Sequence, residues 1–205
     1  MFLESRTDGE RFDARHNDPA LQPVDTFPAG MMRAMFQTFW FTGLSGAGKS
    51  TLAQAFANQL RAQGRACAVL DGDLLRAGLC RDLGFSSADR RENQRRAAEV
   101  AALLNDAGVT VVCALISPLA VDRQMAREIV GADRFAEIYL DASLQECEAR
   151  DPKGLYGRAR RGELPEFTGV SAPYEPPASP TLALPTGRAP LAQCLAPLLA
   201  LAAAS

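Results

Sequence analysis

The chain has 205 residues with 22 lysines and arginines, 24 aspartates and glutamates, a formal net charge of −2 and one histidine. This length favours a single domain with a sizeable core over two small domains. The charge leaves no global basic field to hold a nucleic acid polymer, and the lone histidine argues against a Ser-His-Asp hydrolase or a multi-histidine metal site.

Residues 1–35 are polar and irregular, which predicts a flexible leader followed by one domain at residues 36–205. From residue 36 onward, short apolar runs alternate with segments of helical periodicity. The predicted strands are residues 36–42, 66–70, 109–116, 135–140 and 181–184, and the predicted helices are residues 49–61, 86–108, 117–130, 143–150 and a C-terminal segment. This alternation predicts an α/β fold with a doubly wound sheet.

Three local signals predict helix ends. Gly64 is expected to terminate the first helix, because glycine readily adopts the left-handed conformation found there. Ser86 and Asp89 have the spacing of a capping box. Ser117 and Pro118 are interpreted as an N-cap followed by proline at the first helical position.

Residues 43–50 read Gly-Leu-Ser-Gly-Ala-Gly-Lys-Ser and match the phosphate-loop pattern G-x-x-x-x-G-K-[ST], between a predicted strand and a predicted helix. Glycines let backbone N–H groups approach phosphates closely, and the helix N-terminus adds partial positive charge. Lys49 is expected to reach the β- and γ-phosphates, and Ser50 to help hold Mg²⁺. A glycine-rich turn with a surface lysine is the alternative. The assigned ATP-binding residues are Gly43, Leu44, Ser45, Gly46, Ala47, Gly48, Lys49, Ser50 and Thr51.

With this motif the expected fold becomes a P-loop NTPase-like three-layer sandwich whose five-stranded sheet is mainly parallel. Asp71 and Asp73 follow the second strand, at the sheet edge where ligands bind in open parallel sheets. Asp73 is assigned to Mg²⁺ or to accepting a proton from an attacking hydroxyl, and Asp71 to orienting the loop. A turn with a helix cap is the alternative for both.

Several further motifs occur in a distinctive order. They are residues 70–79 (LDGDLLRAGL), 82–86 (DLGFS), 89–93 (DRREN), 116–118 (ISP), 150–156 (RDPKGLY) and 167–169 (FTG). Their order and spacing over residues 37–186 resemble the adenylylsulfate (APS) kinase family. The resemblance implies transfer of the γ-phosphoryl group of ATP to the 3′-hydroxyl of adenosine 5′-phosphosulfate, which forms PAPS in sulfate activation, with Mg²⁺ as cofactor.

The resemblance also implies residue roles. Phe85 and Phe167 would sandwich the adenine of the acceptor, although Phe85 also fits a hydrophobic staple. Lys49, Asp73 and Lys153 would act in catalysis, and Ser50 with Asp73 would hold the metal. The implied substrate-binding residues are Asp71, Arg76, Phe85, Arg90, Asn93, Ile116, Ser117, Lys153, Gly154, Leu155 and Phe167.

Two assignments have open alternatives. In bacterial members of the family the serine at Ser117 is associated with a phosphoserine intermediate, whereas the residues around it support only a helix cap. Residues 151–169 are rich in loop formers and basic side chains, which suits a mobile lid that excludes water, or a plain basic loop.

Some positions depart from the family pattern and remove polar groups from the acceptor side. They are Leu74, Ala77, Leu115, Leu119, Ala120 and Pro185. Two other functions therefore stay open: a related P-loop kinase for another small alcohol or nucleotide, and a nucleotide-binding module without turnover. The second is disfavoured because Lys49, Ser50 and Asp73 are all present.

The expected partners are ATP and APS, without a nucleic acid polymer or a membrane. Five widely spaced cysteines suit buried residues in a reducing cytoplasm, and the C-terminal apolar run at 189–204 is shorter than the roughly 18 residues of a spanning helix. The family resemblance adds a homodimer and an association with an APS-producing ATP sulfurylase as expectations.

Overall fold

Five parallel strands form the sheet of this chain, whose computed structural model describes residues 38–204. The expected leader at residues 1–35 and the first two residues of the first predicted strand lie outside this range. The strands are β1 (Thr38–Thr42), β2 (Cys67–Asp71), β3 (Thr110–Ala114), β4 (Phe135–Leu140) and β5 (Leu182–Leu184), in the spatial order β2-β3-β1-β4-β5. All four pairings are parallel, which confirms the predicted sheet.

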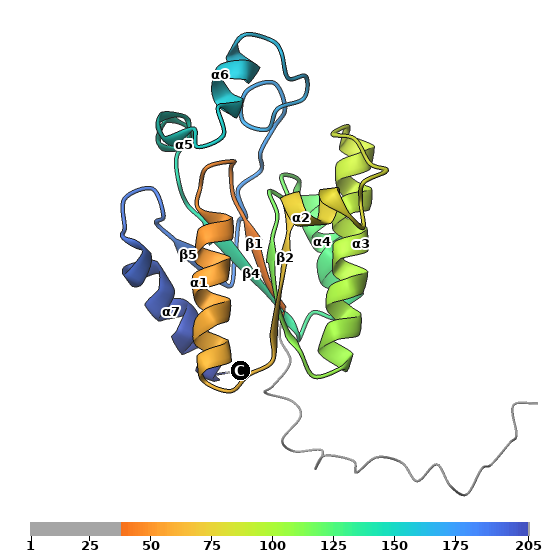
Figure 1. The fold of residues 1–205 in the computed structure, drawn as a ribbon, viewed down its shortest axis with the longest axis vertical. Coiled ribbons are helices and arrows are strands. Elements are labelled where there is room, and N and C mark those ends of the chain that lie inside the picture. Colours follow the sequence, from red (N-terminus) through yellow and green to blue (C-terminus); the bar gives the residue numbers. More distant parts are fainter. Residues whose placement is uncertain (1–37, 205) are drawn as a thin grey trace, which may run out of the picture.

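Helices cover both faces of the sheet, as expected for a doubly wound fold (Figure 1). The longer helices are α1 (Lys49–Ala62), α3 (Ser87–Asp106), α4 (Ala120–Val130) and α7 (Leu191–Ala204), and the short ones are α2 (Gly72–Ala77), α5 (Leu144–Arg150) and α6 (Leu155–Arg160). The helices α1 and α7 pack on one face, and α3 and α4 pack on the other. The three-layer sandwich is therefore confirmed.

The central strand β1 is buried along its whole length and divides the core in two. Phe39 and Phe41 point into the cluster shared with α1 and α7, whereas Trp40, between them, points into the cluster shared with α3 and α4. This follows from the period of two along a strand and explains the unbroken apolar run in the sequence. A strand held from both faces gives the loop that follows it a rigid base.

Two predicted helix ends are confirmed. Gly64 has a φ of 79° just after α1, and its N–H donates to the carbonyl of Arg61 while that of Arg65 donates to Leu60. Ser86 caps α3, because its Oγ accepts from the N–H of Asp89 at 3.1 Å. The Ser86 hydroxyl donates to the Asp89 carboxylate at 2.7 Å, so the N-cap is confirmed, but the carboxylate bonds the hydroxyl where a full capping box has it accept from the Ser86 N–H.

The predicted helix start at Ser117 is wrong. Helix α4 begins at Ala120, and Ser117 has a φ of 44°, which is the left-handed region. The Ala120 N–H donates to a carboxylate oxygen of Glu175 at 2.7 Å, so a residue distant in sequence takes the place of a local cap. Local pattern could not reveal this contact, because it depends on where the chain returns after Phe167.

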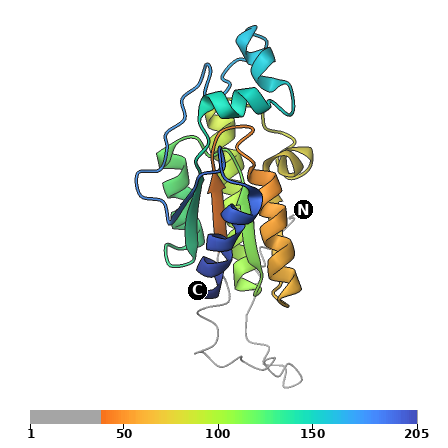
Figure 2. The same ribbon diagram turned by 90° about the vertical axis from the view of Figure 1, so that its left-hand side faces the viewer.

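The segment at residues 151–169 is not purely loop. It contains α6, whose first turn is held by the Asp151 carboxylate, 3.1 Å from the N–H groups of both Tyr156 and Gly157. Both α5 and α6 stand beyond the carboxyl ends of the strands, as the turned view shows (Figure 2). The segment therefore overhangs the sheet edge at which the predicted site residues gather.

Candidate functional site

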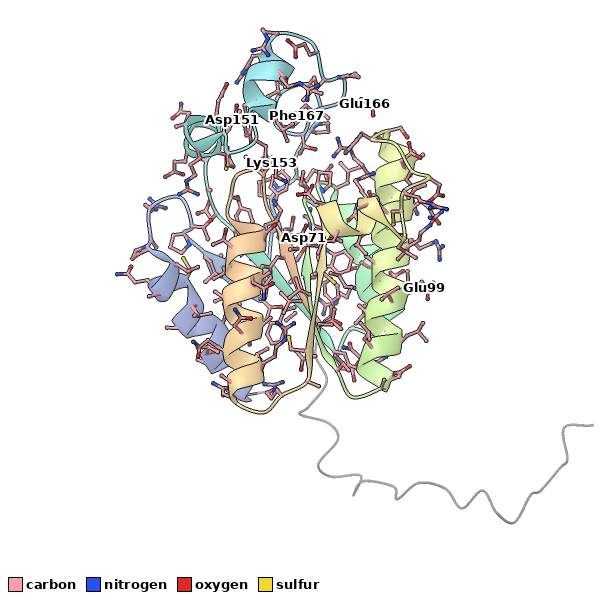
Figure 3. The ribbon with its side chains drawn as sticks, in the orientation of Figure 1. Asp71, Glu99, Asp151, Lys153, Glu166 and Phe167 are labelled. Atoms are coloured by element: carbon pink, nitrogen blue, oxygen red, sulfur yellow. The ribbon has the colours of Figure 1, made fainter. Side chains whose placement is uncertain are left out.

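A cavity of about 980 Å³ opens at the carboxyl ends of the strands. Its walls come from the phosphate loop, α2, α3, the segment after β3, the α5–α6 segment and the turn after β5. The predicted site residues that line it are Ser45, Gly46, Ala47, Gly48, Lys49, Ser50, Thr51, Asp71, Asp73, Arg76, Phe85, Arg90, Asn93, Ile116, Ser117, Lys153, Leu155 and Phe167. Gly43, Leu44 and Gly154 do not line it. Figure 3 shows Asp71 at the end of β2, with Lys153 and Phe167 from the segment at residues 151–169 above it.

The phosphate loop lies between β1 and α1, as its mechanics require. Gly46 and Gly48 have φ values of 78° and 92°, a region in which side chains are strained. A Cβ at Gly46 would also lie 3.1 Å from the carbonyl oxygen of Cys147 on α5. Both glycines are thus required by backbone geometry, and the loop presents its N–H groups at the N-terminus of α1.

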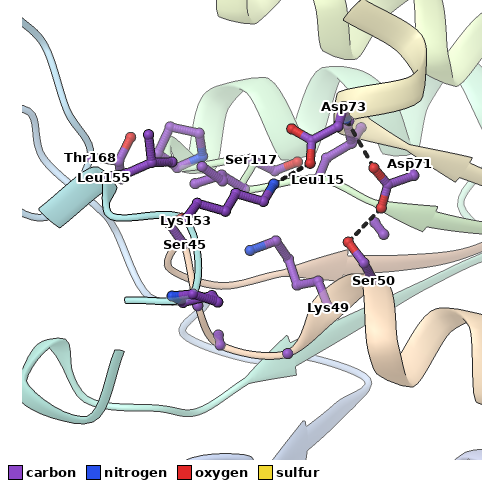
Figure 4. A pocket seen from close by; sticks show the side chains of 18 of the residues that line it. Ser45, Lys49, Ser50, Asp71, Asp73, Leu115, Ser117, Lys153, Leu155 and Thr168 are labelled. Atoms are coloured by element: carbon purple, nitrogen blue, oxygen red, sulfur yellow. Dashed lines mark hydrogen bonds and ion pairs between the residues drawn. The ribbon is translucent and has the colours of Figure 1, made fainter. Parts of the chain in front are cut away.

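Lys49 points back into the phosphate loop (Figure 4). Its Nζ donates to the carbonyl oxygens of Gly43 at 2.9 Å and of Leu44 at 2.7 Å, and only 9% of the residue is exposed. Burial lowers the pKa of Lys49 to about 8. An ammonium held this way by two carbonyls can exchange them for phosphate oxygens, which are stronger partners because they carry charge.

Two aspartates at the start of α2 have different partners. The Ser50 hydroxyl donates to Asp71 Oδ2 at 2.5 Å, and Asp71 Oδ1 accepts from the N–H of Asp73 at 2.9 Å, which caps α2. The Asp73 carboxylate instead bonds the ammonium of Lys153, from the α5–α6 segment (Figure 4). The carboxylate beside Ser50 is therefore that of Asp71, whereas the sequence pointed to Asp73.

Arginines and aromatic rings form the opposite end of the cavity. Phe85 is 60% exposed, and the Arg76 guanidinium lies 4.3 Å from its ring centroid. Phe167 is half-buried and packs edge-to-face on Tyr156, with centroids 5.1 Å apart. Arg90 connects the two sides, because it donates to the carbonyls of Phe85 and Glu166, both at 2.8 Å. Burial lowers the pKa of Arg76 and of Arg90 from the ordinary arginine value.

Two further predicted residues stand in the wall near this end. Asn93 is buried, and its Nδ2 has no hydrogen-bond partner among residues 38–204. Ser117 is 2% exposed, and its hydroxyl accepts from the indole N–H of Trp40 at 2.9 Å. Neither side chain is a solvated surface group, so both are available to shape the cavity.

Gln94 and Arg150 are among the polar cavity residues that sequence reasoning missed. Gln94 follows Asn93 on α3, and its amide donates to Asp122 at 3.4 Å. Arg150 donates from Nη2 to the carbonyls of Thr186 and Gly187, both at 2.7 Å, and from Nη1 to that of Gly46 at 3.3 Å. Arg150 is the first residue of the RDPKGLY motif, which was an available signal, whereas nothing local marks Gln94.

The departures from the family pattern do not all reach the cavity. Leu115 is buried in its wall, next to Gly72, and makes that stretch apolar. Leu74 lies on α2 with most of its surface exposed and does not line the cavity. Of these two substitutions, only that at Leu115 alters the lining directly.

Residues 38–204 hold no cluster of three or more histidine, cysteine, aspartate or glutamate side chains that could bind a metal ion. None of the helices in this range combines the length and apolar character needed to cross a membrane. Ser50 and Asp71 remain as a pair of oxygen donors beside the phosphate loop.

The chain carries a phosphate loop on a doubly wound parallel sheet, and acidic, basic and aromatic groups face this loop across one cavity. These features together define a P-loop kinase. The family model described as adenylylsulphate kinase matches residues 35–185. The chain belongs to the adenylylsulfate kinase family.

Individual relatives agree. An adenylyl-sulfate kinase of Pseudomonas entomophila is 56% identical over 149 residues, which are 73% of this chain and 72% of that protein. The APS kinase CysC of Mycobacterium tuberculosis, solved in complex with AMPPNP and APS, has a TM-score of 0.78 and 46% identity, covering 82% of this chain and 97% of that one. A hexameric APS kinase from Thiobacillus denitrificans has a TM-score of 0.61 and 32% identity, covering 82% of this chain and 29% of that one.

Proposed function

We propose that this protein is an adenylylsulfate kinase, which transfers the γ-phosphoryl group of ATP to the 3′-hydroxyl of APS and releases ADP and PAPS. One observation carries the proposal. A single cavity holds the phosphate loop at one end and the Arg76, Phe85 and Phe167 side chains at the other, with Asp73 and Lys153 between them. A donor triphosphate and a nucleotide acceptor fit this order of groups.

At the donor end, backbone N–H groups of residues 45–50 and the ammonium of Lys49 would bind the phosphates of ATP. Lys49 would leave the carbonyls of Gly43 and Leu44 and contact the β- and γ-phosphates. Charge that shifts during transfer is then balanced by fixed groups that need no reorganisation. Arg150 supports this end, because it ties the Gly46 carbonyl to the turn at Thr186.

At the acceptor end, Phe85 and Phe167 would hold the adenine of APS, and Arg76 and Arg90 would face its phosphate and sulfate oxygens. Asp73 would accept the proton of the attacking 3′-hydroxyl, and Lys153 would stabilise the transferred group. The bond between Asp73 and Lys153 holds the carboxylate in the cavity wall before substrates arrive. Positioning of this kind supplies most of the rate enhancement in phosphoryl transfer.

The class of reaction implies Mg²⁺, and the donor set beside the phosphate loop fits it. Ser50 Oγ and the Asp71 carboxylate are hard oxygen donors, and Mg²⁺ commonly takes one or two protein oxygens with the remainder from phosphates and water. These two residues, with Asp73 nearby, would hold the ion. When bound with ATP, the ion neutralises charge on the β- and γ-phosphates.

The segment at 151–169 would act as a lid over both substrates. It carries Lys153 and Leu155 into the cavity wall and returns through Phe167. Exclusion of water by such a lid prevents wasteful hydrolysis of ATP. The division into a leader at 1–35 and one domain at 36–205 is part of the same proposal.

The test is an assay of ATP consumption together with the product mass, with APS as acceptor and a panel of nucleosides and small alcohols for comparison. ATP-dependent formation of PAPS is the expected result. Transfer only to another alcohol would show that this alcohol, and not APS, is the acceptor. Tight ATP binding without any transfer would show that the protein is a nucleotide-binding module without turnover.

The partners and location extend the proposal. A homodimer in the cytoplasm, working beside an APS-producing ATP sulfurylase, fits the family resemblance, and the relative from Thiobacillus denitrificans is described as hexameric. Light scattering after size exclusion would measure the mass of the assembly. A monomer or a hexamer would contradict the homodimer.

A further inference from the structure

The chain leaves β3 through residues 115–119, here named the acceptor loop, which forms part of the cavity wall before α4 begins. Leu115, Ile116, Ser117 and Pro118 all line the cavity. The loop has no strand partner of its own along most of its length, because the β3 ladder ends at Ala114. Its position must therefore come from other contacts.

Side chains and backbone from elsewhere bind three successive carbonyls of the acceptor loop. The Thr42 hydroxyl donates to Ile116 at 2.7 Å, Nη1 of Arg123 donates to Ser117 at 2.8 Å, and the N–H of Glu175 donates to Pro118 at 2.8 Å. These three donors lie on three separate segments. The loop is thus fixed at every carbonyl from residue 116 to residue 118.

The conformation of Ser117 shows how tightly the loop is held. Its φ of 44° is strained for a serine, and such conformations persist only where the surroundings over-determine them. Besides Arg123 on its carbonyl, the indole of Trp40 bonds its hydroxyl at 2.9 Å. Arg123 is itself anchored by Glu137, at 2.6 Å.

Glu175 makes two contacts with this region. Its N–H bonds Pro118, and its carboxylate accepts from the N–H of Ala120 at 2.7 Å, so it links the loop to the first turn of α4. The neighbouring Tyr174 hydroxyl lies 2.9 Å from Thr42 Oγ1, which anchors the same segment to β1. Glu175 also follows Phe167 by only a few residues, so one segment connects both walls of the acceptor end.

We propose that Glu175 is a positioning residue for the acceptor: its carboxylate fixes the start of α4 and with it the Ser117 wall against which the acceptor binds. The inference rests on the proposed function. Glu175 is exposed and lies outside the cavity. Its carboxylate should affect the binding of the acceptor and not the binding of ATP, because the phosphate loop makes no contact with Glu175 among those described.

Glu175→Ala removes the carboxylate, and Glu175→Gln keeps an oxygen that can accept from Ala120. The alanine variant should raise the KM for APS by roughly fivefold to twentyfold and leave the KM for ATP within about twofold, since only the acceptor wall moves. The glutamine variant should restore the KM for APS. Glu128→Ala is the matched control, because it removes an exposed carboxylate on α4 that accepts from Gln124, and it should behave as the parent.

Trp40 supplies a second readout, because it is the only tryptophan of the chain and it bonds Ser117. Glu175→Ala should shift its emission or its quenching by acrylamide without any substrate present, and Glu175→Gln should not. If the Glu175 carboxylate contributed only stability as a helix cap, its removal would lower the melting temperature. It would change neither Trp40 emission nor the KM for APS at temperatures below melting.

An alanine variant with parental KM for APS and parental Trp40 emission would overturn the proposal, as would a glutamine variant as impaired as the alanine one. If Glu175→Ala does not fold, Glu175→Asp, which withdraws the carboxylate by one methylene, takes its place with the same expected effects. A parent protein without activity on APS would refute the proposed function instead, and Trp40 emission would still decide the role of Glu175.

Discussion

Lys153 and Asp73 are 80 residues apart in the sequence, yet the ammonium of one bonds the carboxylate of the other across the cavity. Both side chains remain more than half exposed, at 54% and 70%, so the pair contributes little to folding and is open to substrates. It connects the segment above the cavity with the first turn of α2.

Asp73→Asn should lower kcat with APS by about 10²–10⁴-fold, because the amide cannot accept the proton of the attacking hydroxyl. Binding of the ATP analogue AMPPNP, measured by calorimetry, should stay close to that of the parent. Parental turnover in this variant would show that Asp73 is not the base. Asp71→Asn is the informative comparison. It should instead raise the Mg²⁺ concentration needed for half-maximal activity, because it removes the carboxylate that bonds Ser50.

Lys49→Arg should lose at least about a hundredfold in kcat/KM although it conserves charge. The Lys49 ammonium lies within 2.9 Å of two loop carbonyls in a space where 9% of the residue is exposed, and a planar guanidinium is larger than this space allows. Lys153→Arg is the matched comparison and should lose less, because its side chain is half exposed. Near-parental activity of Lys49→Arg would contradict the assignment.

The affinity for ATP should fall as the pH rises through about 8. Burial lowers the pKa of Lys49 to about 8, so in the free enzyme the residue loses its proton there and not near 10.5. A neutral amine attracts phosphate less, and binding above this pH must take up a proton. Calorimetry with AMPPNP from about pH 7 to about pH 9.5 measures both effects, and a titration of free AMPPNP over the same range corrects for protons that the ligand itself exchanges. A flat profile would contradict the lowered pKa.

Ser117→Ala separates the two roles left open for this serine. The hydroxyl is buried and bonded by Trp40, which suits a wall residue, so turnover should fall by no more than about tenfold. After incubation of the parent with ATP alone, the intact protein mass should show no added phosphoryl group. Complete loss of turnover together with a phosphorylated parent would establish the covalent route instead.

Gly169→Ala should destabilise the fold by about 2–4 kcal/mol, which combines strain at a φ of 91° with overpacking. Its Cβ would lie 3.0 Å from Leu44 Cδ2 and 3.2 Å from Leu144 Cδ1. Gly64→Ala is the control, because its φ is 79° and no heavy atom lies within 4 Å, so it carries strain alone. Urea unfolding of both variants measures the difference, and equal losses would contradict the packing contribution.

The parts of this structure that depend on local pattern were predictable. The order of strands and helices, the phosphate loop and the caps at Gly64 and Ser86 follow from apolar periodicity and from the backbone needs of single residues. Parallel strands also place their carboxyl ends at one edge, which is why Asp71 and Asp73 were expected at the edge where ligands bind.

What could not be predicted depends on contacts between distant segments. Glu175 acts on backbone groups of Pro118 and Ala120 that no side-chain pattern marks. Ser117 followed by Pro118 matches a common helix start, yet tertiary bonds hold the serine in a left-handed conformation and delay α4 by several residues. That Asp71, and not Asp73, bonds Ser50 is likewise decided by the turn into α2.

The chain has only two lysines, Lys49 and Lys153, and both lie in the cavity wall. Apart from its amino terminus, the protein therefore offers an amine-directed reagent no target outside the site. Lys153 is exposed, whereas Lys49 is buried but deprotonates under mildly alkaline conditions. Labelling yields with and without AMPPNP, resolved by peptide mapping, would then report site occupancy directly, without any engineered probe.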